Sequence, residues 1–129
     1  MNGKLLDTTV LIDLSRRSSA AADYIDAEHA LHTPLFLSVV SAMELVAGCR
    51  DKSEVEQIKK MVADFGLVHL TPAISVKAYE FMWLYNKSHG LAIPDALIAA
   101  TAVSQNLVLA SDNIRHFAML PELLLERPY

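Results

Sequence analysis

Short apolar runs alternate along the chain with longer stretches of helical character. Four runs are mainly apolar and bounded by polar or turn-forming residues, which is the pattern of buried strands: residues 5–6, 35–40, 67–70 and 107–110. A weaker fifth strand is predicted at residues 123–125. Between these runs the sequence predicts helices over residues 20–31, 42–49, 53–65, 72–89 and 95–105.

Residues that commonly begin or end helices support these boundaries. Ser53 and Glu56 have the spacing of a capping box, and Gly66 follows the helix that it would end. Thr71 is placed to cap the start of the next helix, and Pro72 follows it at the first helical position, where proline is favourable. Gly90 is placed to close the longest helix.

Continuous apolar strands that alternate with helices predict an α/β fold. Such strands are buried on both faces, so we expect a mostly parallel sheet of about five strands between two layers of helices. With 129 residues, the chain is expected to form one domain over residues 1–129. Sheets of this kind bind ligands beyond the carboxyl ends of their strands.

The composition excludes several classes of protein. Cys49 is the single cysteine, so there is no disulfide framework, and the N-terminal residues do not resemble a signal peptide. We therefore expect a cytoplasmic protein. No apolar run is long enough to span a membrane, so no membrane association is expected.

Four acidic residues stand at strand ends or inside apolar sequence: Asp7, Glu44, Asp95 and Asp112. If the sheet is parallel, the strand ends and the next helix starts lie on one edge, so these carboxylates converge there. Several carboxylates in a dry cleft raise one another's pKa unless a cation neutralises them. An oxygen-only set of ligands suits Mg²⁺ or Mn²⁺ and does not suit zinc.

Each of these residues also has a purely structural interpretation. Asp7 can cap a following helix, and Ser41 with Glu44 has capping-box spacing. Asp95 sits where a first-turn carboxylate favours the helix dipole, and Asp112 can belong to a turn. The five histidines show no metal-binding pair spacing and are expected at the surface or at boundaries.

The charge balance is consistent with a metal site. The chain has 11 Lys and Arg against 15 Asp and Glu, so setting aside the four candidate ligands leaves 11 acidic residues against 11 basic ones. A metal-loaded edge could then accept a phosphodiester. Basic residues near the motifs would assist: Arg16, Arg17, Lys87 and Arg115.

Four segments in this order resemble the successive motifs of PIN domains. They read Leu-Asp-Thr-Thr-Val-Leu-Ile-Asp at 6–13, Ser-Ala-Met-Glu-Leu at 41–45, Ile-Pro-Asp-Ala-Leu-Ile-Ala-Ala-Thr-Ala at 93–102 and Ser-Asp-Asn-Ile-Arg-His-Phe at 111–117. The resemblance runs nearly end to end and is greatest to the VapC-type toxins of bacterial toxin–antitoxin pairs. It implies a PIN-like α/β/α sandwich and a divalent-metal ribonuclease.

The resemblance also implies the site residues. Asp7, Glu44 and Asp95 would form an acidic core that holds Mg²⁺ or Mn²⁺ during hydrolysis of RNA. The fourth position stays open, because the family motif aligns Asn113 with it whereas coordination chemistry favours the carboxylate of Asp112. Four hydroxyl side chains would support the site by hydrogen bonds: Thr8, Thr9, Ser41 and Ser111.

Related toxins are silenced by a small antitoxin, so a cognate antitoxin protein is an expected partner beside the RNA substrate. The helix at 72–89 carries more large apolar side chains than one narrow core-facing stripe needs, which points to a homodimer contact or an antitoxin groove, and the resemblance favours both.

Two other functions could share a parallel sheet with acidic residues at its edge. The first is a noncatalytic PIN-like module that binds RNA or protein. The second is a phosphotransfer or receiver domain, which the sequence disfavours because Thr9 stands where a dehalogenase-like site needs an aspartate.

Overall fold

Five strands form one sheet, and each pair of neighbouring strands runs parallel. The computed structural model describes residues 3–129. The strand order is β3-β2-β1-β4-β5, so the first strand lies at the centre. The strands are β1 (Lys4–Leu6), β2 (Leu35–Ser38), β3 (Gly66–Val68), β4 (Val108–Ala110) and β5 (Leu125–Glu126). The predicted parallel sheet of about five strands is confirmed.

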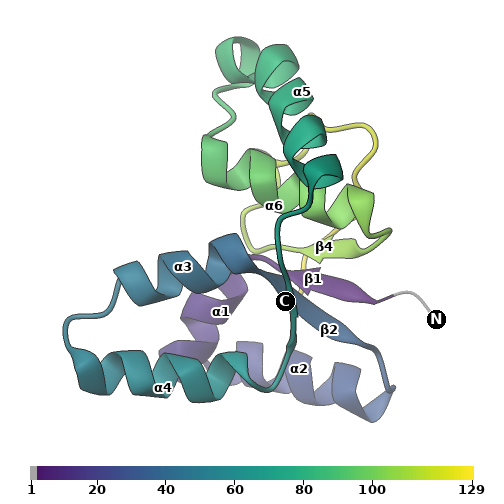
Figure 1. The fold of residues 1–129 in the computed structure, drawn as a ribbon. Helices are drawn as coiled ribbons and strands as arrows, with labels where there is room; N and C mark the ends of the chain where they lie inside the picture. The colour runs from purple at the N-terminus through teal and green to yellow at the C-terminus, as the bar shows by residue number, and fades with distance from the viewer. Residues whose placement is uncertain (1–2) are drawn as a thin grey trace.

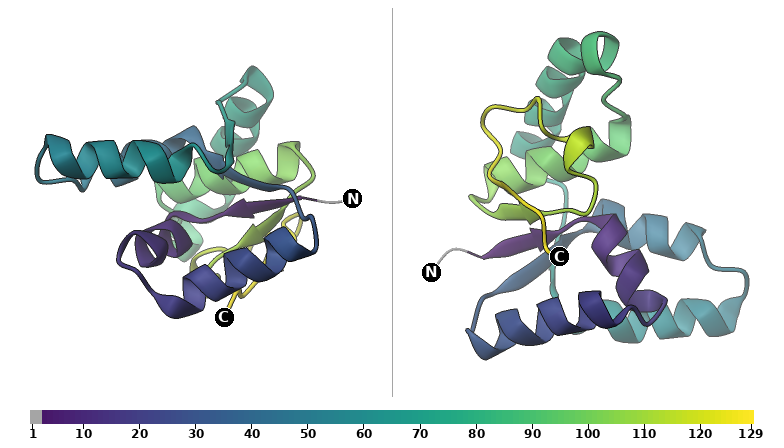
Figure 2. Two further views of the ribbon diagram at one scale, coloured as in Figure 1. Left: turned by 90° about the horizontal axis from the view of Figure 1, so that it is seen from below. Right: turned by 180° about the vertical axis from the view of Figure 1, so that it is seen from behind.

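Helices cover both faces of the sheet (Figures 1 and 2). They are α1 (Thr8–Ser15), α2 (Ser19–Ala30), α3 (Val39–Ala47), α4 (Lys52–Val62), α5 (Pro72–His89), α6 (Ile93–Ser104) and the short 3₁₀ helix η1 (Ile114–His116). Helices α5 and α6 lie on one side, while α1 and α2 lie on the other. None of the helices within residues 3–129 is both long and apolar enough to cross a membrane.

The alternation of side chains along the central strand separates two hydrophobic cores. Successive residues of a strand point to opposite faces, so Leu5 packs with α5 and α6 whereas Leu6 packs with α1 and α2. Phe81 of α5 is 1% exposed in the first core, and Leu11 of α1 is fully buried in the second. The sheet therefore holds the carboxyl end of β1 between two packed layers.

Both ends of α5 agree with the prediction, whereas the predicted cap of α4 is wrong. Thr71 caps α5 by accepting a bond from the Ile74 N–H at 3.2 Å, and Gly90 ends that helix in the left-handed region, as expected. The α4 cap is Asp51 instead of Ser53, because the Asp51 carboxylate accepts the Glu54 N–H at 2.9 Å.

Two further boundary predictions were wrong. Helix α3 begins at Val39, not at residue 42, because the Ser38 hydroxyl accepts the Val40 N–H and ends β2 there. Gly66 does not end α4, which stops at Val62; it opens β3, where a Cβ would collide with the ring of Phe36. Close approach to a neighbouring strand therefore explains this glycine.

Candidate active site

The carboxylate of Asp7 is fixed by two hydroxyl groups at the end of the central strand. Asp7 is 3% exposed, and its Oδ2 accepts bonds from Thr9 Oγ1 at 2.9 Å and Ser111 Oγ at 2.8 Å. Each hydroxyl in turn accepts a backbone N–H from the segment after β4, that of Asp112 or Asn113. Each hydroxyl proton is thus directed at the carboxylate.

The capping interpretation of Asp7 is wrong. The residue occupies the N-cap position of α1, yet its side chain accepts no capping bond. Both of its side-chain hydrogen bonds fall on Oδ2, so Oδ1 receives none from residues 3–129. An oriented carboxylate with one free oxygen is suited to bind a cation.

Glu44 reaches the same region from α3. Thr8 Oγ1 lies 2.9 Å from Glu44 Oε1 and 2.8 Å from the hydroxyl of Ser41. Ser41 is fully buried and lies inside α3, so the proposed capping box of Ser41 and Glu44 is wrong. Ser41 and Thr8 instead join α3 to α1 and hold the glutamate.

Asp95 lies in the first turn of α6, where its negative charge is favoured by the helix dipole. Burial raises the pKa of its carboxyl, and the negative charge of Asp7 raises it further. His116 opposes this rise, with its Nδ1 3.4 Å from Asp95 Oδ2, and Glu44 adds to it. The net effect is a raised pKa for Asp95.

The fold therefore brings three carboxylates from different elements into electrostatic contact. Asp7 follows β1, Glu44 belongs to α3 and Asp95 to α6. Within residues 3–129, no three His, Cys, Asp or Glu side chains are arranged to ligate one ion as they stand. The fit to a divalent ion rests on the donor chemistry, because hard oxygen ligands and excess negative charge are what Mg²⁺ and Mn²⁺ bind.

The two candidates for the fourth position lie just beyond β4. The carboxylate of Asp112 is exposed, and its Oδ1 lies 3.5 Å from the guanidinium of Arg127, which follows β5. Asn113 is exposed and precedes η1, and its carbonyl accepts the His116 N–H. Asp112 is not among the charges that raise the pKa of Asp95.

Two residues at this edge were not singled out by the sequence. His116, expected only as a surface or boundary histidine, is exposed and contacts Asp95. Its position in the last motif, directly before Phe117, could have marked it as a residue near the site. No sequence feature pointed to Arg127, because its contact with Asp112 depends on the pairing of β5 with β4.

Comparisons with known proteins agree with this geometry. The family model described as PIN domain matches residues 4–122. The chain is 38% identical over 120 residues to Ribonuclease VapC10 of Mycobacterium tuberculosis, which covers 92% of this chain and 89% of the relative. It is 32% identical over 127 residues to Ribonuclease VapC19 of the same species, covering 98% and 99%.

Solved structures show the same fold. A toxin–antitoxin complex from Klebsiella pneumoniae superposes with a TM-score of 0.81 at 26% identity, over 98% of both chains. The DNA-bound VapBC of Salmonella typhimurium gives 0.83 at 18% identity, over 100% of both chains. The matched motifs, the parallel sheet and these relatives together show that the chain belongs to the PIN domain family, among the VapC ribonucleases.

Proposed function

We propose that this protein is a Mg²⁺- or Mn²⁺-dependent ribonuclease that hydrolyses RNA phosphodiester bonds as the toxin of a toxin–antitoxin pair. Asp7, Glu44 and Asp95 are the metal-binding carboxylates. The observation that carries the proposal is the convergence of these three carboxylates, with Asp7 and Glu44 held by hydroxyl groups and close enough to Asp95 for their charges to raise its pKa beyond the effect of burial. Three carboxylates that repel one another are the electrostatic complement of a divalent cation.

The surrounding residues prepare the carboxylates for this task. Thr9 and Ser111 hold Oδ2 of Asp7 and leave Oδ1 available, while Thr8 holds Glu44. The N-terminal end of α6 favours negative charge beside Asp95, which includes the charge of an RNA phosphate. A divalent ion bound here would supply Lewis-acid stabilisation to the phosphate during attack by water.

The direct test is cleavage of total cellular RNA by the purified protein with Mg²⁺, with Mn²⁺ or with EDTA. We expect cuts that need a divalent ion. A folded protein that binds RNA without turnover would instead support the noncatalytic PIN-like module.

The fourth site residue is the subject of a separate prediction. We expect Asn113→Ala to lower the cleavage rate more than Asp112→Ala, because the Asp112 carboxylate is turned to Arg127. A loss of about 10–100-fold is typical when a supporting ligand is removed. Single-turnover cleavage by the two variants decides the question, and a larger loss in Asp112→Ala would assign the position to Asp112.

We infer that a cognate antitoxin protein binds this chain. The Klebsiella structure that it resembles is described as a toxin–antitoxin complex, and the resemblance covers nearly the whole chain. The cytoplasmic location stays a prediction.

We also propose a homodimer formed through α5. Val76, Tyr79 and Trp83 are 66–74% exposed and follow one another at three- and four-residue spacing along this helix, so they share a face. A second copy of the chain could cover this stripe with its own, as in twofold contacts generally. Light scattering after gel filtration should give twice the monomer mass of 14.2 kDa for the wild type.

Trp83→Ser should shift that mass towards the monomer, since the tryptophan is the largest side chain of the stripe. The exposed Leu31, which follows α2, lies outside the stripe, so Leu31→Ser is the matched control and should remain dimeric. A monomeric wild type would contradict the prediction.

A further inference from the structure

A hollow lies beside the site, on the side of Glu44. Its volume is about 480 Å³, within the range of small-ligand pockets, and its lining comes from α1, α3 and α4 and the loop between α3 and α4. Glu44 forms part of the wall, so the hollow adjoins the candidate metal site through this one carboxylate. Ile12, Leu45 and Ile58 provide apolar surface.

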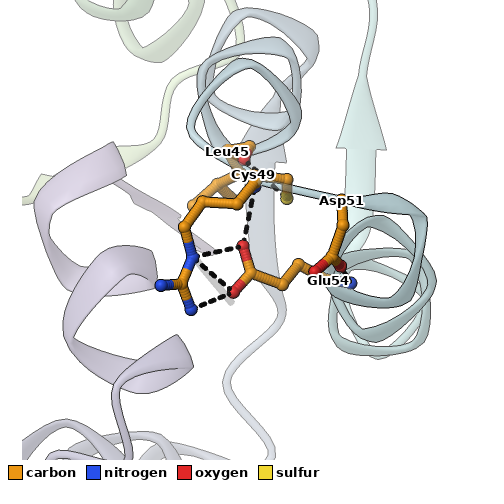
Figure 3. A network of polar contacts seen from close by, with 5 residues as sticks. Leu45, Cys49, Asp51 and Glu54 are labelled. Carbon is orange, nitrogen blue, oxygen red and sulfur yellow. Dashed lines mark hydrogen bonds and ion pairs between the residues drawn. The ribbon is translucent and has the colours of Figure 1, made fainter.

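The two arginines that line this hollow differ in their partners. Arg50 is bound by Glu54: its Nη2 lies 2.8 Å from Oε2, and its backbone N–H donates to Oε1 at 2.7 Å (Figure 3). Its charge is therefore already neutralised. Arg16, at the end of α1, forms no ion pair with any carboxylate of residues 3–129. It is the unbalanced positive charge of the hollow.

We propose that this hollow is a substrate subsite that holds the RNA nucleotide next to the cleaved phosphodiester, with Arg16 binding the phosphate of that nucleotide. The inference rests on the proposed ribonuclease function. The hollow lies past Glu44, so a chain of phosphates that leaves the carboxylate cluster on that side would enter it. Apolar wall residues and one free guanidinium match a base with its phosphate.

The same charge argument favours RNA over a protein segment in the hollow. Glu44 and Glu54 are its acidic residues, one assigned to the metal site and the other bound by Arg50. The charge left over is positive, and its complement is an anion. An apolar protein segment would leave the Arg16 charge without a partner.

The single cysteine provides a probe inside the hollow. Cys49 is half-buried, lines the hollow, and contacts the Leu45 carbonyl through its Sγ at 3.3 Å. Its alkylation by N-ethylmaleimide can be followed by intact mass, since no other thiol is present. The probe ligand is a 20-nucleotide oligouridine RNA, and the protein is the full chain with Asp95→Asn, so that the RNA is not cut.

We expect the oligouridine to slow alkylation of Cys49 several-fold at saturation. Adding Arg16→Gln should raise the RNA concentration needed for half protection by roughly tenfold, because one charged hydrogen bond is lost. It should also lower the slope of log affinity against log salt by about 0.7. Lys60→Gln removes the same charge from an exposed residue of α4 that does not line the hollow, and should retain protection.

Two results would overturn the subsite. Equal protection in the Arg16 and Lys60 variants would remove the role of Arg16. A wild-type protein that cleaves RNA while oligouridine leaves alkylation of Cys49 unchanged would show that the hollow does not hold the RNA nucleotide. A different result would contradict the ribonuclease proposal alone. In that case the wild type would cleave no RNA, although RNA would still protect Cys49 from alkylation.

Discussion

Replacing Asp95 by asparagine should abolish RNA cleavage without unfolding the protein. The substitution removes one of three converging negative charges and scarcely changes side-chain volume. Loss of metal-assisted stabilisation amounts to several kcal/mol of the barrier, so we expect a rate at least about a thousandfold lower. Cleavage of total RNA with Mg²⁺ or Mn²⁺ measures the loss, and circular dichroism checks the fold.

Asp26 provides the matched control for this substitution. It is an exposed aspartate on α2, on the helical layer away from α6, so Asp26→Asn changes the net charge equally. Full activity is expected for this control. Full activity in Asp95→Asn would remove Asp95 from the site.

The same substitution should raise thermal stability in EDTA at neutral pH. Burial and the charge of Asp7 raise the pKa of Asp95 in the folded state, so ionised Asp95 opposes folding at pH values above its folded pKa. That penalty disappears as pH falls through the folded pKa towards the ordinary value of the group. The advantage of the variant should therefore shrink on acidification.

This prediction is tested by measuring the unfolding temperatures of the wild type and Asp95→Asn at several pH values, first in EDTA and then with Mg²⁺. Added Mg²⁺ should stabilise the wild type more than the variant, because only the intact carboxylate set binds the ion well. Equal responses of both proteins to Mg²⁺ would contradict the assignment.

Truncation of Leu109 should produce the largest loss of stability among the variants considered. Leu109 lies in β4, is fully buried, and pairs in register with Leu5 of the central strand. Leu→Ala in such a core costs about 2–5 kcal/mol, because transfer energy is lost and a cavity remains. That is a large part of the 5–15 kcal/mol typical of a whole domain.

Leu124→Ala is the matched control, because it removes the same atoms from a side chain that is 60% exposed. We expect this variant to stay within about 0.5 kcal/mol of the wild type. Urea unfolding of both variants gives the difference in the free energy of unfolding. Equal losses would mean that β4 does not carry the central core.

The comparison bears on the site because Ser111 follows β4 directly and donates to Asp7. A loosened β4 should therefore also reduce the orientation of that carboxylate.

The sequence by itself determined those features that depend on neighbouring residues. Apolar runs formed the strands β1, β2 and β4, although Leu67 and Leu70 of the run at 67–70 are 41% and 43% exposed, so that run is not the buried strand predicted. Thr71 begins α5 through its own hydroxyl, and Gly90 ends it through its backbone conformation. These local preferences were sufficient for the parallel sheet and for most helices. The order and spacing of the four motifs were sufficient for the PIN domain family.

Only the tertiary structure decided what the polar side chains of the site do. Ser41 had local capping spacing, yet its hydroxyl bonds Thr8, which is 33 positions away in the chain. Ser111 reaches Asp7 across 104 positions, and Arg127 reaches Asp112 only because β5 lies beside β4. A short polar side chain takes whichever partner the fold brings within about 3 Å, and that distance is set by strand order and helix packing, which no local pattern encodes.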